Sequence, residues 1–266
     1  MAPDEFPLPY EYRFIQIENL VTEPPADLEE RTIVFLDCGN IDRNPADSLK
    51  REGAHILNVD HHHDNTQFGT VNLVVPEASC TAEVIWDLTR DLGVSLTRPI
   101  AEALYVGLIT DTGSFRWASA RAHRLAARLV ELGVDNASIS RALLDTHPFA
   151  WLPMLSRVLA SAQLLPDAAE GRGLVYAVVG HQEWENARPE EVESIVDIVR
   201  TTQQAEVAAV FKEIELGHWS VSMRSKSYDL ATLASTFGGG GHLQAAGYSA
   251  TGSADDVVHA LREALH

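Results

Sequence analysis

The sequence predicts a two-domain α/β protein, in which a mainly parallel sheet with its helices is followed by a smaller α+β domain. Two short runs rich in β-branched residues, 32–37 (TIVFLD) and 55–60 (HILNVD), each stop on an aspartate. Buried parallel strands with a polar carboxyl end have this pattern. Because helical periodicity alternates with these strands, we expect an α/β sheet. The stretch 166–173 (PDAAEGRG) is polar and contains proline and glycine, which is typical of a linker.

The first domain is expected over residues 1–165. Between the two strands, 44–53 (NPADSLKREG) starts with Asn-Pro and ends on glycine, which favours a short helix. From Ser79 onward apolar residues recur at helical spacing, and Ser79 or Thr81 with Glu83 resembles a capped helix start. Further helices are expected over 100–115, over 120–133 and on to about residue 164.

The second domain is expected over residues 174–266. The stretch 173–180 (GLVYAVVG) predicts a strand, and 206–225 predicts two strands around a Leu-Gly turn. Residues 189–200 (PEEVESIVDIVR) begin with proline and carry acids in their first turn, which favours a helix. The final helix is expected over 253–265 (SADDVVHALREAL).

Composition and charge exclude several classes of protein. Hydrophobic residues make up 45% of the 266 residues, so the chain is neither disordered nor fibrous. The net charge of −18 argues against a protein that holds long duplex nucleic acid on a basic face. Cys38 and Cys80 form no zinc-type spacing, which fits a reducing cytoplasm. Without a secretory leader pattern or a long apolar run, we expect a cytoplasmic protein with no membrane segment.

Acidic and histidine side chains follow apolar elements at three places. These are Asp37, the run Asp60-His61-His62-His63, and Asp111. In open α/β sheets, ligands bind at the carboxyl ends of the strands. Oxygen and imidazole donors without thiolates suit manganese, or less well magnesium, better than zinc. A carboxylate can bridge two such ions about 3.5–4 Å apart, which activates water and neutralises a phosphoryl transition state.

Each of these residues taken alone has an ordinary structural explanation. A single aspartate at a strand end is more often a helix cap or a turn residue, and a single histidine is more often a surface or core side chain. Three histidines in a row behind a buried aspartate are harder to explain by packing, because neighbours in an extended segment point to opposite faces. His61 and His62 are therefore candidates, whereas His63 is assigned no functional role.

A run of four glycines, 238–241, ends in His242. Without Cβ atoms, such residues let backbone N–H groups approach an anion. We expect a helix to start in the following LQAAG and to add a favourable dipole. The alternative is a flexible hinge or a tight turn. The candidate phosphate or nucleotide contacts are Gly239, Gly240, Gly241 and His242.

Together these motifs resemble a known family. Asp60-His61-His62, preceded by Asp37 and followed by the TDTGSF stretch around Asp111, resembles the DHH phosphoesterase superfamily. The stretches 222–226 (SMRSK) and 237–247 (FGGGGHLQAAG) resemble the DHH-associated domain. The resemblance covers nearly the whole chain and is closest to the nanoRNase and pAp phosphatase type. RecJ-type exonucleases are longer, and family II pyrophosphatases end in a different second domain without the glycine run.

The resemblance implies a role for each site residue. Asp37 would bridge two manganese ions, with His61 and Asp111 completing one of the two sites. His62 would lie near the scissile phosphate, and Asp60 would orient the histidines. The substrate would be held by Arg224, whose guanidinium can clamp a phosphate, with Arg116 and Ser225 as helpers for which a purely solvated role is equally open.

The resemblance also implies the reaction and its partners. The chain would hydrolyse short oligonucleotides (nanoRNA), pAp, or linear or cyclic dinucleotides to mononucleotides, in a cleft between its domains. Short single-stranded RNA or DNA would be bound, and long duplexes and membranes would not. The sequence leaves a homodimer open.

One family motif is missing. The family pattern begins with H-x-x-x-D-x-D, but the first histidine here is His55, after Asp37. A shortened reading frame and a natural loss of one metal site both explain this. We therefore expect at most one tightly bound ion, at Asp37, His61 and Asp111. The alternative function is a non-catalytic nucleotide-binding or regulatory module.

Overall fold

The computed structural model describes residues 8–15, 17, 31–43, 54–185 and 187–265. Its contacts divide the chain into two compact units, Met1–Thr146 and His147–His266.

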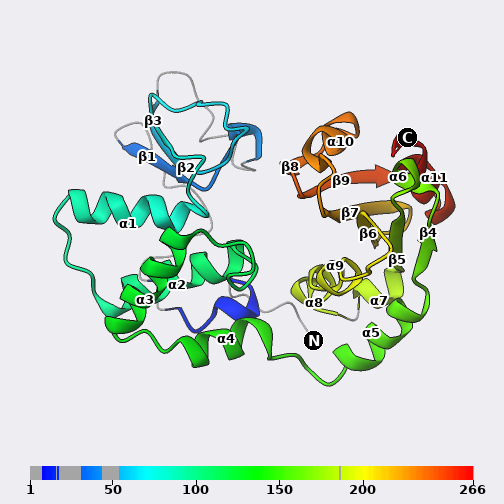
Figure 1. Cartoon of the computed structure of the whole chain (residues 1–266), viewed down its shortest axis with the longest axis horizontal. Helices are drawn as coiled ribbons and strands as arrows, with labels where there is room; N and C mark the ends of the chain where they lie inside the picture. The colour runs from blue at the N-terminus through cyan, green and yellow to red at the C-terminus, as the bar shows by residue number, and fades with distance from the viewer. Residues whose placement is uncertain (1–7, 16, 18–30, 44–53, 186, 266) are drawn as a thin grey trace. The chain divides into compact units, whose positions relative to one another are not determined.

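The first unit contains a three-stranded, fully parallel sheet (Figure 1). Its strands are β1 (Thr32–Leu36), β2 (His55–Asp60) and β3 (Val71–Val74), with β2 in the centre. The α/β prediction and its two strands are confirmed. The sequence analysis missed β3, because its four residues are too few to show a pattern. Leu36 pairs with Val59, so Asp37, directly after β1, lies beside Asp60, the last residue of β2.

In the described part of this unit, four α-helices accompany the sheet. The short 3-10 turns η1 (Tyr10–Tyr12) and η3 (Ile41–Arg43) accompany them. The helices are α1 (Thr81–Asp91), α2 (Arg98–Asp111), α3 (Ala120–Glu131) and α4 (Asn136–Leu144). Figure 1 shows α1 running along the sheet with α2 and α3 beyond it. Leu108 and Leu129 are fully buried in their shared core. The helices predicted from Ser79 and over 120–133 are confirmed, and the helix expected over 44–53 lies outside the described residues.

The second unit is built on a six-stranded mixed sheet of order β4-β5-β6-β7-β9-β8. The strands are β4 (Gln163–Leu165), β5 (Leu174–Val179), β6 (Val207–Glu215), β7 (His218–Ser225), β8 (Gly240–His242) and β9 (Ala245–Thr251). The helices are α5 (Trp151–Ala160), α6 (Ala168–Gly171), α7 (His181–Glu185), α8 (Pro189–Glu193), α9 (Ile195–Val199), α10 (Leu230–Thr236) and α11 (Ala254–Ala264). The strands and the final helix expected here are confirmed. The helix expected over 189–200 is present as two short helices that meet at Ser194.

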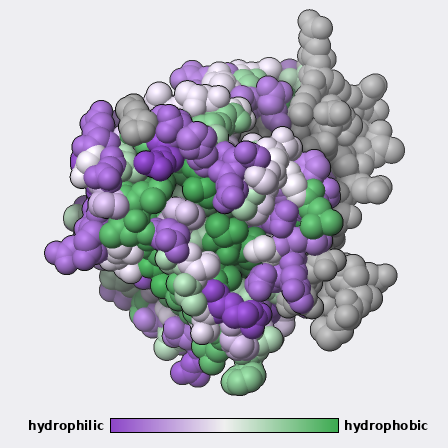
Figure 2. Space-filling model, turned by 90° about the vertical axis from the view of Figure 1, so that its right-hand side faces the viewer, coloured by the Kyte–Doolittle hydropathy of each residue, from purple (hydrophilic) through white to green (hydrophobic). Residues whose placement is uncertain are grey.

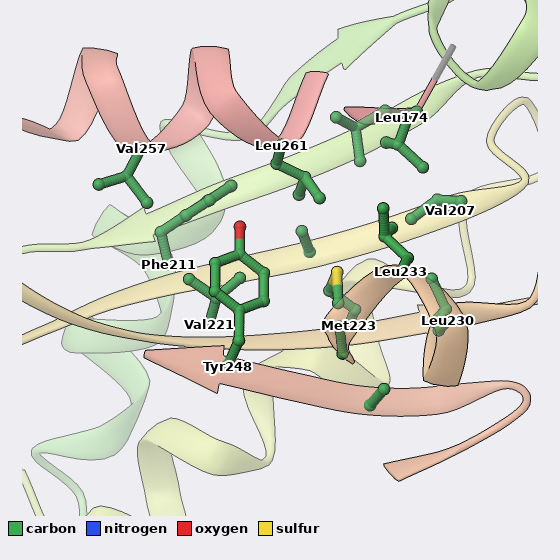
Figure 3. Close-up of a cluster of buried hydrophobic side chains, with 14 of the residues drawn as sticks. Leu174, Val207, Phe211, Val221, Met223, Leu230, Leu233, Tyr248, Val257 and Leu261 are labelled. Atoms are coloured by element: carbon green, nitrogen blue, oxygen red, sulfur yellow. The ribbon is translucent and has the colours of Figure 1, made fainter. Parts of the chain in front are cut away.

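The two faces of this sheet are covered differently. On one face, Phe211, Met223 and Tyr248 pack under α10 and α11 (Figure 3). On the other face, Val210 and its neighbours on β5 and β6 pack against α5, α8 and α9. Strand β7 presents Ser220, Ser222 and Arg224 in alternation with buried Val221 and Met223, so polar side chains occupy its second face.

The structure divides the chain at a different place from the expected boundary at 165. Helix α5 belongs to the second unit, because Met154 and Val158 pack against β5 and β6. The expected linker 166–173 is part of the fold, since Ala168 and Ala169 are buried in the core below α11. A polar stretch with small residues gives no indication in the sequence that its alanines will be buried.

The helix expected after the glycine run is wrong. Residues 245–251 form β9, which pairs with both β7 and β8. Ala246 and Tyr248 are buried in alternation with less buried neighbours, which is the period of a strand and not of a helix. No helix dipole is therefore available at this point of the glycine run.

Among the described residues, no helix is long and apolar enough to cross a membrane. On the face shown in Figure 2, hydrophilic residues surround and interrupt the hydrophobic ones. Exposed large hydrophobic residues are common on ordinary protein surfaces, and they require no further explanation here.

Candidate active site

Asp37 stands at the carboxyl end of β1 in a strained conformation. Its φ is +58°, a left-handed value that is uncommon for a residue other than glycine. The Asp37 N–H donates to the Val59 carbonyl on β2 (3.1 Å), which holds it beside the centre of the sheet. Its side chain is 60% exposed. Residues with such backbone strain are concentrated at functional sites, which makes Asp37 a candidate for a metal-binding carboxylate.

Thr81, at the first position of α1, fixes the Asp37 carboxylate. The Thr81 hydroxyl donates to Asp37 Oδ1 (2.7 Å). The expected helix cap is arranged differently from the prediction, because Cys80 occupies the N-cap position without a side-chain bond and Glu83 accepts from the Ser79 N–H. The Thr81 hydroxyl is thereby available to Asp37. The sequence analysis did not identify this role for Thr81.

Asp60 is fully buried and its carboxylate is engaged on both oxygens. Oδ1 accepts from the His61 N–H (2.8 Å) and from His62 Nδ1 (2.7 Å), and Oδ2 accepts from the Asn65 amide. Burial raises the pKa of Asp60, but these hydrogen bonds outweigh it and hold the pKa far below its usual range. The hydrogen bond to Asp60 in turn raises the pKa of His62. Asp60 is thus placed to orient His62.

His61 is buried and aims one ring nitrogen at two carboxylates. Its Nδ1 lies 3.2 Å from the Ala78 carbonyl, and its Nε2 lies 3.1 Å from Asp111 Oδ2 and 3.7 Å from Asp37 Oδ1. Burial lowers the pKa of His61, but the bond with Asp111 outweighs this and raises the pKa to about 8. If Nδ1–H donates to the Ala78 carbonyl, Nε2 is the ring nitrogen that faces the carboxylates and would bind a metal ion.

Asp37, His61 and Asp111 fit a bound divalent cation. Ligand atoms about 2.0–2.2 Å from one ion lie about 3 Å apart; the His61 Nε2–Asp111 distance of 3.1 Å matches this, whereas Asp37 Oδ1, at 3.7 Å from Nε2, would have to move closer. Two carboxylates and one imidazole suit manganese-like ions. Asp37 also lies near Asp60 and His62 in a second possible group. In that group both oxygens of Asp60 already accept hydrogen bonds, so Asp60 acts there as the partner that orients His62.

The turn after α2 places Asp111. Gly113, Ser114 and Phe115 all have positive φ, which ends the helix earlier than the expected 115. The Trp117 ring lies against Gly113, where an added Cβ would come within 2.1 Å of it. The Trp117 Nε1–H donates to the Asp111 carbonyl (2.9 Å). The position of Trp117 just after TDTGSF is the signal in the sequence that could have identified this contact.

In the second unit, Arg224 lies near the end of β7. Its side chain is 30% exposed, and its Nε lies 3.9 Å from Asp197 Oδ1. Burial lowers its pKa, with Asp197 acting in the opposite direction. The Ser225 hydroxyl donates to the Tyr228 carbonyl (2.7 Å), so its proton is already used. Arg116, which belongs to the first unit, is exposed.

The glycines of the run are required by close strand packing. At Gly239 an added Cβ would lie 2.1 Å from the Gly247 carbonyl oxygen, and at Gly241 it would lie 2.5 Å from the Ala245 carbonyl oxygen. Gly240 and His242 are half-buried members of β8. Backbone of the run nevertheless lines a hollow of about 350 Å³, together with the hydroxyl-bearing residues Ser220, Ser222 and Ser249. The run therefore serves the hairpin and also borders a polar concavity.

The structure thus brings together the five candidates of the first unit, namely Asp37, Asp60, His61, His62 and Asp111. His63 is exposed. Besides Thr81 and Trp117, the sequence analysis missed Asn65, which follows the histidines in the same loop and bonds to Asp60.

Comparison with known proteins identifies both halves of the chain. The family described as "DHH family, N-terminal domain" matches residues 6–108, and the "DHHA1 domain" matches residues 171–266. A bifunctional oligoribonuclease and PAP phosphatase NrnA from Thermus thermophilus is 30% identical, over 95% of this chain and 77% of the relative. The NrnA of Bacillus subtilis is 24% identical, over 83% of this chain and 70% of the relative.

A solved structure shares the fold. The exopolyphosphatase-related protein from Bacteroides fragilis superposes with a TM-score of 0.78 at 23% identity, over 88% of this chain and 70% of that chain.

Proposed function

This chain belongs to the DHH family of phosphoesterases and carries a DHHA1 domain, and we propose that it hydrolyses very short oligonucleotides to mononucleotides with manganese. The resemblance found in the sequence is confirmed, and the family makes the chain a hydrolase of phosphate esters. pAp and linear or cyclic dinucleotides are further substrates of the same chemical class. The observation that carries the proposal is the convergence of Asp37, His61 Nε2 and Asp111.

The site residues of the first unit have separate proposed roles in metal binding and catalysis. Asp37, His61 and Asp111 would hold the cation, which when bound supplies an activated water and neutralises phosphoryl charge. Thr81 keeps the Asp37 carboxylate in place, and the Ala78 carbonyl keeps the His61 ring in place. His62, oriented by Asp60, would face the substrate phosphate.

The second unit would recognise the nucleotide. Arg224 is a half-buried guanidinium that can bind a phosphate in a bidentate manner. His242 and the backbone at Gly239, Gly240 and Gly241 would add contacts. The chain carries a net charge of −18, so each additional phosphate of a long strand would meet repulsion away from these groups. This favours short substrates.

The test is hydrolysis with added manganese, comparing RNAs of about two to five nucleotides and pAp with a strand of about 24 nucleotides. We expect turnover of the short substrates only. A preference for the long strand would instead indicate a processive exonuclease. Tight binding of dinucleotides without turnover would favour the non-catalytic nucleotide-binding module.

A further inference from the structure

The second unit contains a buried lysine that the proposed chemistry does not use. Lys212, on β6, is 1% exposed. Its ammonium donates to Glu193 Oε1 and to the Ser222 hydroxyl, the latter over 2.7 Å. The Ser222 hydroxyl in turn donates to Glu193 Oε2 (3.1 Å). A buried ammonium is costly unless it is paired and hydrogen-bonded, and this closed triangle satisfies that need.

The triangle holds Glu193 as a fixed, outward-facing acceptor. The Glu193 side chain is 50% exposed, although both of its oxygens accept hydrogen bonds from the buried side, from Lys212 and Ser222. An ionised carboxylate only accepts hydrogen bonds and has about four acceptor positions. Two of these are used by Lys212 and Ser222, so the others are available to a donor from solvent. A carboxylate that is only a counter-ion for Lys212 does not need this exposure.

The neighbourhood of Glu193 has the features of a nucleotide site. Ser222 and Arg224 are two residues apart on β7, so their side chains share one face of the sheet, roughly 6.6 Å apart along the strand. One nucleotide can span its sugar and its phosphate over such a distance. Ser222 also lines the polar hollow beside Gly239 and Ser249.

The charges of this cluster also favour a phosphate with hydroxyl groups. The cations Lys212, Arg224 and Arg200 face the carboxylates Glu193 and Asp197, which leaves one net positive charge on a strongly acidic chain. Arg224 can bind a phosphate, whereas Glu193 repels it and attracts a hydroxyl donor. The pair is therefore complementary to adjacent phosphate and sugar groups.

We propose that Glu193 selects ribonucleotides by accepting a hydrogen bond from the ribose 2′-hydroxyl, with Lys212 and Ser222 as positioning residues. The inference rests on the proposed function and deepens it, because it assigns the sugar specificity of the substrate. The 2′-hydroxyl is the group by which a protein distinguishes RNA from DNA. An acidic residue binds the ribose 2′-hydroxyl in dinucleotide-binding folds in the same way.

The experiment measures binding of 5′-phosphorylated diadenylate in its ribo and deoxy forms to the full chain, with hydrolysis suppressed by a chelator. Glu193→Gln keeps the acceptor for Lys212 but removes the charge. Glu215→Gln, at the exposed end of β6, is the matched control. We expect wild type and the control to prefer the ribo form about tenfold. Glu193→Gln should lose most of this preference by weakening the ribo form alone.

Lys212→Met tests the positioning role. With its fold checked by circular dichroism, it should also reduce the ribo-to-deoxy ratio, which a purely structural lysine would leave unchanged. Three outcomes would overturn the inference while leaving the proposed function intact. They are a wild-type ribo-to-deoxy ratio near one, an unchanged ratio in Glu193→Gln, and equal weakening of ribo and deoxy binding in that variant. If wild type neither binds nor, with manganese, hydrolyses either dinucleotide, the proposed function fails and the inference with it.

Discussion

Two polar clusters, one in each unit, balance their charged side chains in opposite ways. In the first unit, Asp37 and Asp111 converge on the nitrogen of a single histidine, His61, so the cluster lacks a fixed cation of its own. In the second unit, Lys212 supplies the cation and Glu193 and Ser222 close around it. The first arrangement is suited to receiving a metal ion, and the second is suited to holding a recognition group in place. Substitutions in the cluster of the first unit should therefore affect catalysis. Substitutions in the cluster of the second unit should affect substrate specificity or the stability of the fold.

The largest effect is expected from breaking the first cluster at its histidine. His61→Gln removes the ring nitrogen that faces both carboxylates, so turnover should fall roughly a thousandfold. Elemental analysis of the purified wild-type chain should find at most one tightly bound manganese ion. His63→Gln, which changes an exposed neighbour, is the control. Two equivalents of manganese with full turnover would show that other residues complete a second site.

Removing the guanidinium of the second unit should affect binding more than the chemical step. Arg224→Ala is expected to weaken binding of a short oligonucleotide by roughly 1.5–3 kcal/mol, the scale of a charge-assisted hydrogen bond. Titration calorimetry measures this, with Arg90→Ala, which changes an arginine that is 63% exposed, as the comparison. Unchanged affinity in the Arg224 variant would rule out its assigned role.

The closed cluster should show an asymmetry in stability. Glu193→Ala leaves the Lys212 ammonium buried with only Ser222 as a partner, and should lower the free energy of unfolding by about 2 kcal/mol. Lys212→Met leaves a half-exposed carboxylate that water can solvate, and should cost less than about 1 kcal/mol. Urea unfolding of both variants checks this. The reverse order would mean that Lys212 contributes mainly through packing.

An indirect effect on the metal site is expected at Thr81, which acts on it through Asp37. Thr81→Val removes the 2.7 Å hydrogen bond to Asp37 Oδ1. It should lower manganese affinity about tenfold, which is the lower end of the loss seen when a residue that hydrogen-bonds to a metal ligand is replaced. Thr89→Val is the control, since the Thr89 hydroxyl bonds only to the Trp86 carbonyl of the same helix. Equal affinities in the two variants would count against the positioning role.

Local patterns allowed much of the fold to be predicted. The β-branched runs that became β1 and β2 and the alternating residues of β7 are clear strand patterns, and these elements are present. Strand β3 is too short to be recognised. Residues 243–247 look like a helix start because alanine and glutamine favour helices, but pairing with β7 and β8 overrides that local preference.

The sequence by itself determined the chemistry available, namely the strand-end aspartates, the paired histidines and the arginine before the glycine run. Only the tertiary structure decided which atoms meet. Thr81 reaches Asp37 across 44 residues of sequence, and Lys212 reaches Glu193 across 19. The physical reason is that such contacts depend on how strands and helices pack, and a periodic pattern records only the face on which a residue lies.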